Sequence, residues 1–199
     1  WGSTLSQLGL RLTVALSAPL AALTGMGIAF NAMEEQASIA FTTLLGSAQK
    51  SQAFLSQMKD FAAKTPFEFP GLIQASQRML AMGFAAESIL PTLRSVGDAA
   101  AALGQGQEGI DRIILALGQM QARGKVVTQE MNQLTEAGIP AWRILGESIG
   151  VTQMALRDMV EKGVVPADKA VKVLLEGMDR NFGGMMEKQA TTFKGLMST

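Results

Sequence analysis

The stretch KVVTQEMNQLTEAGIPAWRILGESIGVTQMALRDMVEKGVVPADKAVKVLLEGMDRNF, residues 125–182, repeats one pattern. A segment with apolar residues at helical spacing ends at a glycine, one or two β-branched residues follow, and a cap residue or a proline opens the next segment. The junctions are Gly138-Ile139-Pro140, Gly150-Val151-Thr152 and Gly163-Val164-Val165-Pro166. Glycine readily adopts the left-handed conformation that ends a helix, and proline is favoured in a first turn. The pattern therefore predicts short helices that meet at steep angles.

The first half of the chain shows similar signals. Asn31 and Glu34 have the spacing of a capping box, Gly46 is placed to end that helix, and Ser47 is placed to cap the next one. Apolar residues recur at three- and four-residue spacing in both segments, which predicts an αα-hairpin with one buried side. These residues are Ile39, Phe41, Leu44, Leu45, Phe54, Leu55, Met58, Phe61 and Ala62.

The hexamer TPFEFP (residues 65–70) separates two predicted helices. Thr65 and Glu68 have capping-box spacing, whereas a residue that precedes proline is biased away from the helical conformation. We expect one tight turn at Thr65-Pro66, a break, and a new helix that carries Pro70 in its first turn and ends at Gly83. The hexamer is thus predicted to set the angle between two helices, with Phe67 and Phe69 buried.

Further along, Pro91 predicts a stop and restart of the helix around it. The loop GQGQEG (104–109) is predicted to be a linker, because it lacks the lysine and the serine or threonine of a phosphate-binding loop. A long amphipathic helix is expected over 110–123, ended by Gly124. Val126-Val127 and Val164-Val165 are too short to be more than connectors. The fold class predicted is all-α, a multi-helix module of short amphipathic helices joined by glycine and proline turns.

The start of the chain has a different composition. Between Arg11 and Glu34 no residue is charged, and VALSAPLAALTGMGIAF (14–30) is small and apolar. Ser17, Pro19 and several glycines dilute its hydrophobicity, so a helix packed against other copies of the chain is favoured over a transmembrane span. The residues expected to contact a membrane or another copy are Leu16, Leu20, Leu23 and Ile28. The expected division of the chain is an apolar lead-in helix over 1–32, a helical module over 33–182, and a linker over 183–199 toward a longer C-terminal region.

The composition disfavours several classes of function. The 199 residues include 17 Lys and Arg against 17 Asp and Glu, and there is no histidine, cysteine or tyrosine. The imidazole base, the thiolate nucleophile and the commonest zinc ligands are thus missing. No nucleophile is paired with a plausible base, and we expect no enzyme activity, no catalytic or metal site and no cofactor.

Residues 144–163, ILGESIGVTQMALRDMVEKG, have the spacing of a helix-turn-helix. Such a motif reads DNA through polar and basic side chains of its second helix. Here that helix offers Gln153 and Arg157 but also Asp158 and Glu161, whose carboxylates would face phosphates unfavourably. Packing is favoured over DNA binding for this segment.

Several longer segments resemble one family, the conserved tape measure domain of bacteriophage and prophage tail tape measure proteins. They are MEEQASIAFTTLLGSAQKSQAFLSQMKDFAAKTPFEFPGLIQASQRMLAMGF, SVGDAAAALG, ALGQMQARGKVVTQEMNQLTEAGIPAW and MVEKGVVPADKAVKVLLEGM, in this order. The resemblance covers about Met33 to Ser198. The family-motif residues that it marks are Thr65, Pro66, Phe67, Glu68, Phe69, Gly97, Asp98, Gly124, Gly138, Ile139 and Pro140.

The resemblance implies a structural role in the virion. Proteins of this family lie in the lumen of the phage tail as long helical chains in a few copies, and their length sets tail length. The implied partners are the tail tube protein, tail assembly chaperones, and tail tip or baseplate proteins. A homo-oligomer is also implied, with a trimer favoured over a hexamer. On infection these proteins leave the tail ahead of the DNA and reach the host envelope, so a membrane-active module that aids genome passage is the alternative expectation.

Overall fold

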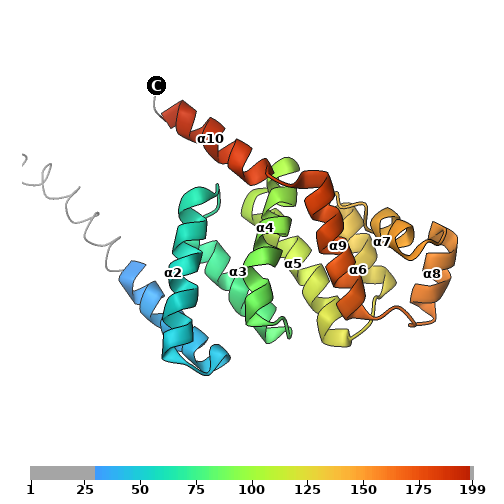
Figure 1. Cartoon of the computed structure of the whole chain (residues 1–199), viewed down its shortest axis with the longest axis horizontal. Helices are drawn as coiled ribbons and strands as arrows, with labels where there is room; N and C mark the ends of the chain where they lie inside the picture. The colour runs from blue at the N-terminus through green and yellow to red at the C-terminus, as the bar shows by residue number, and fades with distance from the viewer. Residues whose placement is uncertain (1–29, 198–199) are drawn as a thin grey trace, which may run out of the picture.

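The computed structural model describes residues 30–197, and side chains as far as residue 192. Within this range the chain is all-α and contains no strand, which confirms the predicted fold class. The chain is helical from residue 30 to 45, and the helices that follow are α2 (Ala48–Lys64), α3 (Phe69–Ala81), α4 (Ala86–Ala102), α5 (Gly106–Arg123), α6 (Thr128–Glu136), α7 (Ala141–Ile149), α8 (Gln153–Glu161), α9 (Ala167–Phe182) and α10 (Met185–Met197). They form an elongated body with helix 30–45 at one end and α8 at the other (Figure 1).

Helix α4 is the centre of the body. It packs against α3, α5, α9 and α10, and all of its residues from 95 to 100 are buried. The sequence GDAAAA at 97–102 explains this position, because small side chains let neighbouring helices approach closely from several sides. A similar close approach occurs where α9 meets α7, since a Cβ at Gly177 would collide with Ile144.

The predicted glycine junctions are confirmed. Gly138, Gly150 and Gly163 have φ of 85°, 77° and 67°, the left-handed region that glycine adopts without strain. After the second junction the Thr152 side chain accepts a hydrogen bond from the Ala155 N–H at 3.2 Å and caps α8. The two predicted connectors lie side by side, where the Val126 N–H donates to the Val165 carbonyl at 2.9 Å.

The predicted αα-hairpin is also confirmed. The Phe41 and Phe54 rings pack with centroids 4.8 Å apart, and the Ser47 side chain accepts from the Lys50 N–H at 3.3 Å at the start of α2. Ile39 and Leu44 differ from expectation, because they are 64% and 45% exposed rather than buried.

Other local predictions in the first half are wrong. Residue 30 is already helical, so Asn31 does not begin a helix, and Glu34 instead forms an ion pair with Lys59 at 2.7 Å. Pro91 does not interrupt α4: it lies exposed near the start of the helix, where its missing N–H leaves only the Glu87 carbonyl without its usual partner. The linker predicted over 104–109 is shorter, since α5 begins at Gly106.

The hexamer 65–70 has another geometry than expected. Thr65 ends α2, where its N–H donates to the Ala62 carbonyl at 3.3 Å, and does not open a turn. Glu68 precedes α3 without a side-chain capping bond. Helix α3 begins at Phe69, so Pro70 lies in its first turn as predicted.

Residues 183–199, expected to be a linker, contain α10. This helix packs on α4 and leaves the body across its upper side (Figure 1). The division of the chain into domains stays a prediction, but the segment after α9 is structured as far as residue 197.

Candidate functional site

Residues from three distant segments meet where α10 begins. Phe67 comes from the hexamer, Gly97 and Asp98 come from α4, and Met186 comes from the first turn of α10. We call Phe67, Gly97 and Asp98 the notch. It holds the start of α10 against the body and borders a groove.

Asp98 caps α10 from a different helix. Its side chain is buried, and its two carboxylate oxygens accept hydrogen bonds from the Gly184 N–H at 3.0 Å and the Met186 N–H at 2.8 Å. These N–H groups lie at the start of a helix, where no intrahelical carbonyl can accept them. A carboxylate is well suited to this place, because the N-terminal end of the helix dipole is positive.

Gly97 makes room for this contact. A Cβ at this position would lie 2.5 Å from the Met186 sulfur and 3.2 Å from Cε2 of Phe67. A side chain here would therefore push away either the end of the Met186 side chain or the phenylalanine ring. Met186 is buried as a result of this fit.

The prediction that both phenylalanines of the hexamer are buried is confirmed. Phe67 packs against α4 at Gly97, and Phe69 packs against Phe30 with ring centroids 5.7 Å apart. The hexamer thus joins the hairpin to the centre of the body. The hydroxyl of Thr65, the first residue of the hexamer, is buried and has no hydrogen-bond partner among the described residues.

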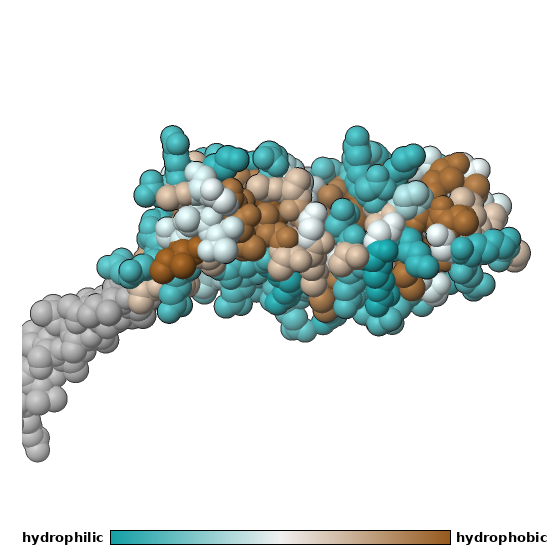
Figure 2. Space-filling view, turned by 90° about the horizontal axis from the view of Figure 1, so that it is seen from below, coloured by the Kyte–Doolittle hydropathy of each residue, from teal (hydrophilic) through white to brown (hydrophobic). Residues whose placement is uncertain are grey.

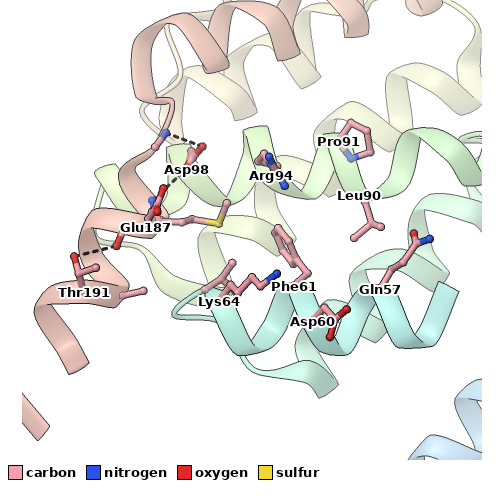
Figure 3. Close-up of a pocket in the computed structure, with 14 residues that line it drawn as sticks. Gln57, Asp60, Phe61, Lys64, Leu90, Pro91, Arg94, Asp98, Glu187 and Thr191 are labelled. Atoms are coloured by element: carbon pink, nitrogen blue, oxygen red, sulfur yellow. Dashed lines mark hydrogen bonds between the residues drawn. The ribbon is translucent and has the colours of Figure 1, made fainter. Parts of the chain in front are cut away.

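A groove of about 840 Å³ lies beside the notch, between α2, α4 and α10 (Figure 3). Its apolar lining includes Phe61 from α2, Leu90 from α4, and Met186 and Ala190 from α10. Its charged lining includes Asp98, which caps α10, and also Asp60, Lys64, Arg94 and Glu187. None of these last four forms an ion pair within the described part of the chain.

This lining suits contact with a polypeptide. The apolar residues offer a surface for side chains, and the groove carries unpaired charges of both signs around them. Residues 30–197 contain no group of three acidic side chains placed to hold a metal ion. Over the same range, no helix is both long enough and apolar enough to span a bilayer.

Four family-motif residues of the second half lie away from the groove, whereas Thr65 lines it. Gly124, with φ of 70°, ends α5, and Gly138 ends α6. Ile139 is fully buried, and Pro140 precedes the first residue of α7. These residues shape helix junctions. Leu16, Leu20, Leu23 and Ile28 lie outside the described residues.

In the helix-turn-helix candidate, α7 and α8, the basic side chain of the second helix is engaged in packing. The guanidinium of Arg157 lies 4.2 Å from the centre of the Trp142 ring, a cation–π contact. The indole N–H of Trp142 donates to Asn132 at 3.1 Å. The prediction against DNA binding stays a prediction.

The sequence did not reveal the partners of Asp98. A signal was present, since Asp98 is a charged residue within the small apolar run of a helix predicted to have a buried face, and such a residue needs a partner. The linker expected from residue 183 onward gave no indication of where the next helix would dock.

Comparison with known proteins gives a family and one curated relative. The family described as "Tape measure protein" matches residues 25–199. The chain is 28% identical over 152 residues to "Mu-like prophage FluMu protein gp42" of Haemophilus influenzae, an alignment that covers 75% of this chain and 24% of that protein. The chain therefore spans about a quarter of the length of this relative. No solved structure matches.

Replacing Phe67 tests the role of the notch in stability. We expect Phe67→Ala to lower the free energy of unfolding by about 3–5 kcal/mol, because a buried aromatic ring that bridges two segments is lost. Urea unfolding followed by circular dichroism measures this loss. Glu68→Ala, a change at the exposed neighbour, is the matched control and should differ from the parent by no more than about 0.5 kcal/mol. A Phe67→Ala protein as stable as the parent would contradict the role assigned to the ring.

Proposed function

This chain belongs to the tape measure protein family, and from this membership we propose that it is the folded module of a ruler that sets the length of a phage tail. The observation that carries the proposal is the family match over residues 25–199, which includes every described residue. The likeness to a prophage protein supports the same role. In this role the chain is a structural protein of the virion tail.

In the proposed mechanism, length is measured by a longer part of the protein than the module described above. Tail tube subunits polymerise around that extended part, with help from tail assembly chaperones, until its end is reached. The module contributes a folded body at one place along the ruler, where its groove offers a surface to the tube or to tip or baseplate proteins. On infection the protein leaves the tail lumen ahead of the DNA and enters the host envelope.

The charge balance supports contacts with protein rather than with nucleic acid. Positive and negative side chains are equal in number, so no net field attracts the phosphate backbone. The chain also contains 13 methionines, whose flexible side chains adapt to irregular surfaces.

Tail length gives a direct test of the ruler. Removing about 100 residues from an extended helical region of the full-length protein should shorten the tail by about 150 Å, at roughly 1.5 Å per helical residue. Electron microscopy of the resulting virions measures the change. Removing residues 30–197 instead should reduce the yield of tails, because a folded contact surface is lost rather than a length of chain. Tails of unchanged length after the first deletion would contradict the proposal.

A homo-oligomer is part of the proposal, and a trimer is expected. Light scattering of residues 1–199 and of residues 32–199 measures the mass of each. We expect the longer chain to be a trimer that becomes a monomer on deletion, because the uncharged lead-in supplies small side chains for close helix packing. A monomer in both cases would show that the lead-in does not hold copies of the chain together.

A second candidate function, membrane contact during genome passage, rests on the absence of charge between Arg11 and Glu34. A charged side chain is costly to place in a bilayer, and this stretch has none. A peptide of residues 12–33 should therefore bind liposomes, and the triple change of Leu16, Leu20 and Leu23 to Asp should abolish binding. Co-sedimentation with vesicles measures this. If both peptides sediment with the vesicles to the same extent, or if neither sediments with them, membrane contact through these leucines is contradicted.

A further inference from the structure

We propose that α10 is a strap that closes one side of the groove and opens as a unit about Gly183-Gly184, while the rest of the body stays folded. The notch holds the first turn of α10 against the body, and we call this holding contact the latch. Over residues 185–192 few side chains of α10 are buried, and the hydrogen bonds that hold its first turn end on Asp98.

The attachment of α10 is narrow. Over residues 185–192, where side chains are described, only Met186 and Ala190 are buried, one helical turn apart on the same face. The outward side chains are Glu187, Lys188, Gln189, Thr191 and Thr192, which are exposed. The two hydrogen bonds that fix the start of the helix end on the single carboxylate of Asp98.

The preceding segment has the properties of a hinge. Gly183 and Gly184 are adjacent and exposed, with φ of −52° and 79°. A Cβ at Gly184 would meet no atom within 4 Å, so apart from its N–H bond to Asp98 this glycine has open space beside it. Two glycines in succession can absorb a large change of backbone angles without moving their neighbours. Rotation at this point changes the direction of α10 and leaves α9 in place.

Of the described residues of α10, only Met186 belongs to the main hydrophobic core. Helix α4 also packs against α9, α5 and α3, which enclose it apart from the strap. Buried segments of this kind open only with the whole fold, whereas a helix held by few buried contacts opens locally at lower free energy. Opening of α10 removes Met186, Glu187, Ala190 and Thr191 from the wall of the groove, where Figure 3 shows α10 beside α4. It also uncovers Phe67, whose ring lies with the Met186 sulfur beside Gly97.

Thiol labelling separates local opening from global unfolding in this chain, because it contains no cysteine. Ala190→Cys places one thiol on the packed face of α10, beside the groove, and Ala116→Cys places one in the fully buried face of α5. We expect an aromatic disulfide reagent to label the first thiol at least about ten times faster than the second in native buffer. Because position 190 also borders the groove, opening of α10 is read from the change in this rate on Asp98→Asn.

Asp98→Asn tests the latch. This change weakens the charge-assisted hydrogen bonds from the two N–H groups. The rate of thiol labelling at position 190 should therefore rise by roughly ten-fold, and the rate at position 116 should change by less than about two-fold. Asp60→Asn is the matched control, because it removes the same charge from the groove wall on α2 without touching the capping bonds. An equal rise at both thiols, or an equal effect of Asp98→Asn and Asp60→Asn at position 190, would overturn the proposal.

Discussion

The body depends on the close approach of several helices to one segment of α4. Between residues 95 and 100 this helix is buried on all sides, which is possible because its side chains there are small. Each neighbouring helix packs against this segment or next to it. Helices α9 and α5 cover two of its sides, and α3 follows the hexamer that carries the two phenylalanines. The first turn of α10 is capped by Asp98 of this segment. A side chain at position 97 would have to move the side chain of Met186 or the ring of Phe67.

The features that could be predicted from the sequence are local ones. The left-handed glycines at 46, 124, 138, 150 and 163 and the cap at Ser47 follow from the conformational preferences of single residues, and the structure has them where the spacing indicates. Pro91 shows where local reasoning fails. A missing N–H weakens a helix only at one carbonyl, and packing of the rest of α4 outweighs that loss.

Less of the candidate site could be predicted. The resemblance marked Phe67, Gly97 and Asp98 as motif residues, and the burial of Phe67 followed from its place beside a helix start. The bond from Asp98 to Gly184 joins residues 86 positions apart, so no local pattern contains it. The groove likewise exists only after α2, α4 and α10 are assembled. The exposed Ile39 and Leu44 have the spacing of a buried face, but the apolar pattern does not tell which side of a helix near the end of a body finds a neighbour.

The narrow attachment of α10 also determines the direction in which the chain leaves the body. A helix of 13 residues is about 20 Å long at roughly 1.5 Å per residue, and it acts as a lever whose pivot is its first turn. A tilt of about 10° at the pivot would therefore shift its far end by about 3 Å, close to the diameter of a water molecule. The direction of α10 is thus set by two hydrogen bonds to the carboxylate of Asp98 and by the missing side chain of Gly97.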